Sequence, residues 1–196
     1  MRFTHVLQLS GLLSLVAPSI VSAQDPGQLG ITMGYPTAVG VIWHLTDSIA
    51  IRPEVNVTTS TTNVTLTSTS ATAYGVGVSG LFYVKHWDAL RAYVAPRYAY
   101  QHGSATSSTG IDLPLPLPID LPSFQTSTTT SQHNFSGLFG AQYLLHRHFG
   151  VFGEVGATYT SVTTRFTATP PLPATEANPS SHAFGFRSGV GAIFYF

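Results

Sequence analysis

The sequence predicts an all-β protein, an eight-stranded antiparallel up-and-down β-barrel that crosses a membrane. Charged residues make up only 8% of the 196 residues, whereas an ordinary soluble domain has about 25%. Apolar and polar residues alternate with a period of two along most of the chain, which is typical of strands with two different faces. The charges within the alternating segments fall on the face of the small residues, opposite the large aromatic ones. Charges on one face and large apolar residues on the other are expected when the apolar face meets lipid.

Eight alternating segments are candidate strands, and turn residues bound each of them. They lie at about 28–35, 37–46, 49–61, 70–85, 90–102, 132–145, 149–164 and 182–196. The connections after the second, fourth and sixth segments are tight, whereas those after the third, fifth and seventh are long. Short turns at one end and long loops at the other are typical of membrane barrels. We therefore expect external loops at about 58–72, 103–131 and 165–181. The Thr/Ser-rich segment at 58–72 alternates well enough to extend the barrel wall beyond the membrane as a hairpin.

The N-terminus predicts an export signal. Arg2 supplies a positive start, an apolar stretch follows, and small residues end it at Ala23. We expect cleavage after Ala23, which leaves residues 24–196 as a single outer-membrane barrel domain. A retained membrane anchor is the alternative, but the apolar stretch is short for a spanning helix and Pro18 interrupts it.

Composition excludes several classes of site. The formal net charge is zero, so no basic field would attract nucleic acid. The chain has no cysteine, which excludes disulfides, thiolate metal sites and a cysteine nucleophile. His102, His133 and His182 lie near the loop-side ends of candidate strands, but their spacing does not show the convergence that a metal site needs. We expect neither a metal nor a cofactor.

Strand parity places six charged residues on the face of the small residues. They are Arg52, Glu54, Arg91, Arg97, Glu154 and Arg187. A charge at the lipid midplane costs about 2–4 kcal/mol, so this segregation has a physical cause. An eight-stranded barrel is just wide enough to be filled by its own side chains. We predict that these residues form a polar network that plugs the lumen; the alternative is a narrow, porin-like channel that favours anions.

Aromatic residues lie toward the ends of the candidate strands. They are Tyr35, Trp43, Phe82, Trp87, Tyr98, Tyr100, Tyr143, Tyr159 and Phe194. Girdles of aromatic residues at both membrane interfaces are expected of a membrane barrel. Pro53 and Pro96 fall inside strands, where each removes a backbone donor, and we expect β-bulges at both positions.

The chain ends on an aromatic strand, "GVGAIFYF". With the alternation before it, this ending resembles the OmpA/OmpX-like eight-stranded outer-membrane barrel family over about residues 28–196. The resemblance implies that Phe194, Tyr195 and Phe196 act as the signal read by the barrel-assembly machinery. It also implies residence in the cell outer membrane, in contact with outer-membrane lipid that includes lipopolysaccharide.

The expected role is structural or surface-interacting, without enzymatic activity. A lipid A-modifying enzyme is an alternative, because His102-Gly103-Ser104 is similar to the His-x-Ser element of barrel lipid A deacylases. Ala105 follows that element where the deacylases have Asn, and no carboxylate stands where it would orient the histidine. A soluble lipocalin-like barrel would show the reverse parity, with aromatic residues inside.

Overall fold

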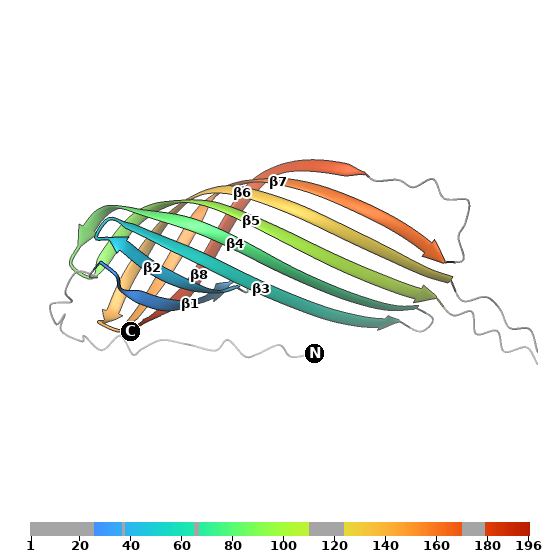
Figure 1. The fold of residues 1–196 in the computed structure, drawn as a ribbon, viewed down its shortest axis with the longest axis horizontal. Coiled ribbons are helices and arrows are strands. Elements are labelled where there is room, and N and C mark those ends of the chain that lie inside the picture. Colours follow the sequence, from blue (N-terminus) through green and yellow to red (C-terminus); the bar gives the residue numbers. More distant parts are fainter. Residues whose placement is uncertain (1–25, 37, 65–66, 110–123, 170–178) are drawn as a thin grey trace, which may run out of the picture.

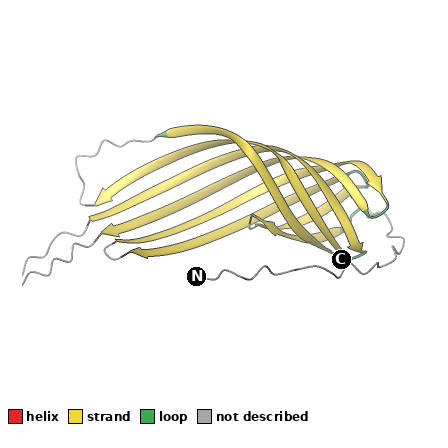
Figure 2. Cartoon of the chain, turned by 180° about the vertical axis from the view of Figure 1, so that it is seen from behind, coloured by secondary structure: helices red, strands yellow, loops and turns green. Residues whose placement is uncertain are grey.

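The structure, a computed structural model, describes residues 26–36, 38–64, 67–109, 124–169 and 179–196. Its eight strands are β1 (Leu29–Tyr35), β2 (Ala38–Thr46), β3 (Ile49–Val64), β4 (Thr67–Trp87), β5 (Leu90–Thr109), β6 (Phe124–His146), β7 (Phe149–Thr169) and β8 (Ser180–Tyr195). Each strand pairs antiparallel with the next, and β1 pairs with β8, so the sheet closes into a barrel (Figures 1 and 2). The predicted fold class is confirmed. The expected signal segment, residues 1–23, lies outside the described residues.

No helix in the described part of the chain is long and apolar enough to cross a membrane.

The strands on the side of the long connections run further than the predicted strand bounds. β3 continues to Val64 and β4 begins at Thr67, so most of the segment at 58–72 is a β-hairpin, as its alternation predicts. In the same way, strands occupy both ends of the ranges expected as loops at 103–131 and 165–181. These extensions are rich in Thr and Ser. Thr is β-branched and fits a strand well, and the ladder to the next strand continues without a shift of register.

The β-bulges expected at Pro53 and Pro96 are absent, and that prediction is wrong. Pro53 pairs with Val78 and Pro96 pairs with Gly137, in ladders whose register does not shift. A proline lacks the donor toward only one neighbouring strand, so the other neighbour holds the register. The register shifts instead next to the tight turns, near the ends of β2, β4 and β6.

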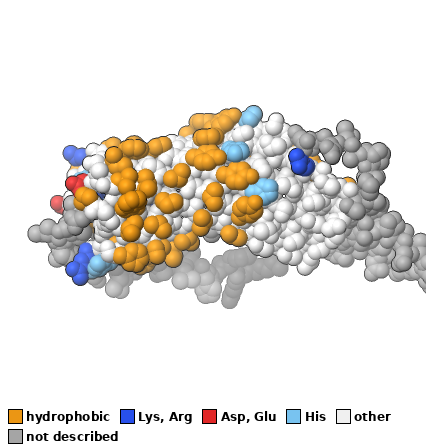
Figure 3. Space-filling view, in the orientation of Figure 1, with side chains coloured by type: hydrophobic (Ala, Val, Ile, Leu, Met, Phe, Trp, Pro, Cys, Tyr) orange, Lys and Arg blue, Asp and Glu red, His pale blue; other side chains and the backbone are white. Residues whose placement is uncertain are grey.

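The two faces of the sheet have the predicted parity. Phe139 and Val155 are 54% and 55% exposed on the outer face, whereas Ile42 and Tyr93 are fully buried inside the barrel. In Figure 3 the hydrophobic side chains on the visible face gather on the half of the barrel that carries the tight turns. The other half of the wall shows few of them on this face. We call these outward-facing apolar side chains the apolar belt. It includes Val41, Trp43, Phe82, Val94, Tyr98, Phe135, Phe139, Tyr143, Val151, Val155 and Tyr159.

Glycines on the inner face make room for large side chains from neighbouring strands. A Cβ atom added at Gly140 would lie 2.5 Å from Cζ of Tyr93. One added at Gly191 would lie 2.5 Å from the ring of Phe152. Real Cβ atoms do not approach other carbons this closely, so each glycine is required by the aromatic ring that covers it. The small residues of the inner face therefore set which bulky residues fit there.

We expect Gly140→Ala to lower the free energy of unfolding by about 1–3 kcal/mol, because the new methyl group overpacks against Tyr93. Urea titration of the refolded barrel, followed by gel mobility without heating, measures this change. Gly137→Ala on the same strand is the matched control, because its Cβ would meet nothing within 4 Å. Equal stability of the two variants would contradict the packing role assigned to Gly140.

Candidate functional site in the barrel lumen

An ion pair crosses the middle of the lumen between β3 and β7. Nη2 of Arg52 donates to Oε1 of Glu154 at 2.7 Å, and the hydroxyl of Tyr93 on β5 donates to the same oxygen at 2.8 Å. The Arg52 guanidinium also lies 5.0 Å from the centre of the Phe152 ring. The side chains of Arg52 and Glu154 are 3% and 8% exposed. The pair is therefore enclosed by the wall, with each charge compensated by the other.

A second ion pair lies beside the first and joins β3 to β5. Nε of Arg97 donates to Oε1 of Glu54 at 2.6 Å, and Nη2 of Arg97 bonds to the same atom. Nε of Arg52 lies 3.9 Å from Oε2 of Glu54. Because Arg52 and Glu54 are two residues apart on one strand, they share the inner face, and Glu54 connects the two pairs. Four of the six charged residues singled out in the sequence thus form one connected cluster.

A neutral polar layer lies nearer the tight turns, and its residues were not among the predicted site residues. Nε2 of Gln142 donates to the hydroxyl of Tyr195 at 2.8 Å, and the Tyr83 hydroxyl donates to Oε1 of Gln142 at 3.0 Å. Nε2 of His44 lies 3.3 Å from the same Tyr195 hydroxyl. All four side chains are buried. Strand parity places Gln142 and His44 on the inner face, so this signal was present in the sequence.

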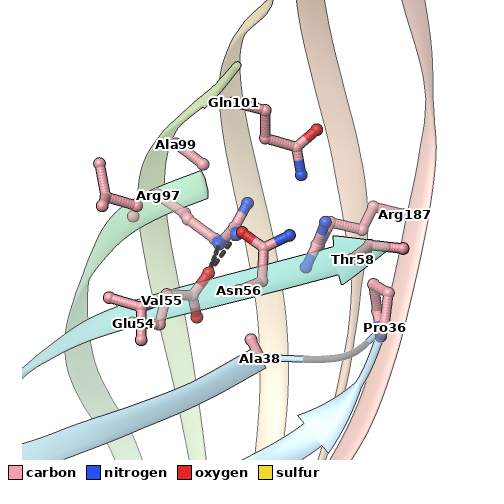
Figure 4. Close-up of a pocket in the computed structure, with 12 residues that line it drawn as sticks. Pro36, Ala38, Glu54, Val55, Asn56, Thr58, Arg97, Ala99, Gln101 and Arg187 are labelled. Carbon is pink, nitrogen blue, oxygen red and sulfur yellow. Dashed lines mark hydrogen bonds and ion pairs between the residues drawn. The ribbon is translucent and has the colours of Figure 1, made fainter. Parts of the chain in front are cut away.

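The remaining charged residues lie at the two ends of the cluster. The Arg91 guanidinium is 5.9 Å from the centre of the Tyr83 ring, beside the neutral layer. Arg187 on β8 is half-buried and forms no salt bridge with a carboxylate of the described residues. It lines a cavity of about 220 Å³ in the part of the lumen toward the long connections (Figure 4).

The three residues of the proposed assembly signal do not share a face. Phe194 and Phe196 point outward and are 47% and 74% exposed, whereas Tyr195 is 3% exposed and points into the lumen. Phe194 pairs with Phe149 of β7 and Ile31 of β1, so the last strand closes the barrel. This strand therefore presents outward rings while it is paired on both sides.

His133 and His182, near the loop-side ends of their strands, each contact a tyrosine on the outer face. The Tyr98 hydroxyl lies 2.9 Å from Nδ1 of His133, and the Tyr159 hydroxyl lies 3.0 Å from Nδ1 of His182. In Figure 3 histidine side chains lie along the edge of the apolar belt that faces the long connections, and others lie near the tight turns. No group of three or more His, Cys, Asp or Glu residues in the described ranges is placed to hold a metal ion.

The arrangement around His102 differs from the one that a deacylase would need. Nδ1 of His102 lies 3.1 Å from Oγ of Ser131 on β6, so its serine contact within the described residues is Ser131 rather than Ser104. The Tyr100 hydroxyl is 3.5 Å from the same nitrogen. No ion pair between His102 and a carboxylate is found in the described residues. Asp112 and Asp120 of the proline-rich loop lie outside them.

We expect Glu154→Gln to lower the free energy of unfolding by about 3 kcal/mol, because the buried Arg52 cation loses the carboxylate that it bonds to and keeps only the more distant Glu54. The glutamine keeps an acceptor for Tyr93, so the change isolates the charge. Urea titration of the refolded protein measures it. The double variant Arg52→Met with Glu154→Gln removes both charges and is expected to regain most of the loss. A double variant as unstable as the single one would contradict the compensation between the two charges.

Similarity to known proteins is found in the fold and not in the sequence. No family model and no curated protein sequence matches this chain. Among solved structures, a major outer membrane protein of Thermus thermophilus is similar with a TM-score of 0.55 and 10% identity, covering 86% of this chain and 98% of that one. CarO2 of Acinetobacter baumannii matches with a TM-score of 0.43 and 15% identity, covering 88% of this chain and 99% of that one. The attachment invasion locus protein Ail of Yersinia pestis has a TM-score of 0.43 and 13% identity, with 86% and 94% covered. The chain has the fold of outer-membrane β-barrels, as the resemblance of its sequence to the OmpA/OmpX-like barrels implies.

Proposed function

We propose that this chain is an integral outer-membrane protein whose lumen is closed by its own side chains. Its role is structural or surface-interacting, without enzymatic activity. The observation that carries the proposal is the polarity of the closed sheet. Large apolar side chains cover the outside, while Arg52, Glu54 and Glu154 are enclosed.

The apolar belt supports placement in a bilayer. On β5 the outward apolar residues run from Leu90 to Tyr98, close to the strand length of about 9–11 residues that spans a membrane. Exposed apolar surface of this extent is unfavourable in water. In hydrocarbon it is favourable, provided that the sheet closes so that its backbone groups pair.

The lumen network supports a closed barrel rather than an open channel. Two ion pairs and the neutral layer of Tyr195, Gln142, His44 and Tyr83 cross the lumen in succession. Eight strands leave an interior that such side chains can fill. The narrow, anion-favouring channel is the alternative that a conductance measurement separates from this proposal.

The parts of the chain beyond the apolar belt support a role at the cell surface. Strands β3 to β7 continue past the belt as a wall rich in Thr and Ser. The pairs Tyr98–His133 and Tyr159–His182 lie at the edge of the apolar belt. Each combines apolar aromatic rings with a hydroxyl and an imidazole nitrogen, which suits the interface between acyl chains and headgroups. We infer that this boundary contacts outer-membrane lipid, including lipopolysaccharide. Insertion through the barrel-assembly machinery, guided by Phe194, Tyr195 and Phe196, belongs to the same proposal.

Placement in lipid predicts that Phe139→Arg lowers the free energy of unfolding in phospholipid vesicles by about 2–4 kcal/mol, because the new charge would face hydrocarbon. Reversible urea unfolding in vesicles measures this change. Gln125→Arg, on the same strand and face but beyond the apolar belt, is the control. It is expected to change stability little, because residue 125 pairs with the uncharged residues Ser108 and Thr169. Equal effects of the two substitutions would refute the membrane placement.

Closure of the lumen predicts that the folded protein in planar bilayers shows no conductance steps above those of the lipid alone. The double variant Arg52→Ala with Glu154→Ala removes the central ion pair and is expected to conduct. Steps from the unaltered protein, with a preference for anions, would favour the narrow channel instead.

A further inference from the structure

Among the described residues, the barrel wall is incomplete where β1 and β2 end. These strands have 7 and 9 residues, whereas β3 to β8 have 16 to 23 (Figure 1). β2 pairs with β3 only as far as Val55, and β1 pairs with β8 only as far as Val190. Beyond these points, residues 56–64 of β3 and 180–189 of β8 pair on one side only within the described part of the chain. We call the space between these two free edges the wall gap.

The wall gap reaches into the apolar belt. A strand needs about 9–11 residues to cross a membrane, and β1 has 7. Phe184 and Phe186 lie on the free stretch of β8 and are 72% and 87% exposed. Phe184 pairs with Tyr159, whose hydroxyl contacts His182 at the edge of the belt. The β1–β2 hairpin therefore ends within the thickness of the belt. The two outward phenylalanines lie beyond its end, on the side of the long connections.

A cavity lies in the lumen beside the wall gap. Its volume of about 220 Å³ far exceeds the roughly 10–15 Å³ that a single water needs. It is lined by Pro36, Ala38, Glu54, Val55, Asn56, Thr58, Val76, Gly77, Arg97, Ala99, Gln101 and Arg187. The hairpin, β3 and β8, which border the gap, all contribute to this lining. Figure 4 shows Arg187 reaching from β8 toward Asn56 on β3, with Gln101 at one end of the same space.

The lining of the cavity has a surplus of one positive charge. Its charged residues are Glu54, Arg97 and Arg187, and the first two form an ion pair. Arg187 has no salt bridge with any described carboxylate. A ligand group with a single negative charge would balance the lining. A carboxylate also matches the planar guanidinium, with which it can form two parallel hydrogen bonds.

We propose that the cavity and the wall gap bind a single-chain amphiphile with a carboxylate headgroup, of the chemical class of long-chain fatty acids. The carboxylate bonds to Arg187, with the amides of Asn56 and Gln101 beside it. The acyl chain leaves the lumen between β3 and β8 and lies along Phe184 and Phe186 in the hydrocarbon. This inference rests on the membrane placement proposed above.

The chain has no native cysteine, so a single fluorescent probe can be attached at a chosen site. The test uses Phe186→Cys, labelled with a small fluorophore, in the full-length folded protein in phosphatidylcholine nanodiscs. Dibromostearate, whose bromines quench fluorescence, is then titrated. Phe139→Cys, labelled in the same way on β6, reports quenching by dibromostearate that is merely dissolved in the bilayer. We expect saturable quenching at position 186 in excess of that at position 139.

Arg187→Gln in the Phe186→Cys background is expected to raise the midpoint of the saturable quenching about ten-fold or more, the loss typical of a charge-assisted hydrogen bond. Arg187→Lys keeps the charge but not the two parallel hydrogen bonds, so it is expected to raise the midpoint less than Arg187→Gln does. Arg165→Gln, on the exposed part of β7, is the control for a general effect of charge. Folding of every variant is checked by gel mobility without heating.

Equal, non-saturable quenching at the two positions would overturn the amphiphile site and leave the membrane placement intact. The same holds if Arg187→Gln and Arg165→Gln have equal effects. Absence of quenching at both positions would overturn the membrane placement, and with it this inference. Saturable quenching that Arg187→Gln leaves unchanged would also overturn it, because a strand from another chain or an acyl chain without a bound headgroup would not need Arg187.

Discussion

Backbone hydrogen bonding in hydrocarbon is the constraint on which the other features of this barrel depend. A sheet in a bilayer has no water to satisfy its N–H and C=O groups, so it must close on itself. Here closure joins β8 to β1 through the pairs from Tyr195 with Gly30 to Val190 with Tyr35. Closure with only eight strands leaves a narrow interior, and every polar side chain of the inner face must fit there. The outer face is then free to be apolar along the whole belt.

The narrow interior explains why Arg52, Glu54, Arg97 and Glu154 bond to one another and why glycines lie near large inner side chains. A charged side chain loses its hydration when it is buried. A close opposite charge and further hydrogen bonds are needed to compensate for this loss. Glu154 meets these requirements with both Arg52 and Tyr93. Tyr93 reaches this place because Gly140 on the neighbouring strand has no side chain to obstruct its ring. Ion pairing and the distribution of glycine are thus two aspects of the same limited space.

The short β1–β2 hairpin departs from this regular scheme. It leaves two strand edges without a neighbour on one side in the described residues, and the cavity that holds Arg187 lies beside them. In the closed part of the barrel, the arginines Arg52 and Arg97 have carboxylate partners. Arg187, which has no such partner among the described residues, lies next to the break in the wall, so the proposed ligand complements both the surplus charge and the missing wall.

The sequence by itself determined the eight strands, their faces and the placement of six charges inside, because a period of two decides the orientation of each side chain along a strand. It did not determine which charges pair. Glu154 lies 102 residues from Arg52, and their contact depends on the register between strands, which alternation within one strand does not specify. The neutral bonds of Tyr195 with Gln142 also required that register. The alternation at 58–72 predicted a hairpin that extends the wall, and the structure has one. The strand extensions within 103–131 and 165–181 were expected as loops, because polarity alone does not distinguish a loop from a strand whose neighbours continue beside it. The strand lengths depend on pairing between strands in the closed sheet. The same pairing sets the position of the wall gap beyond the end of the β1–β2 hairpin.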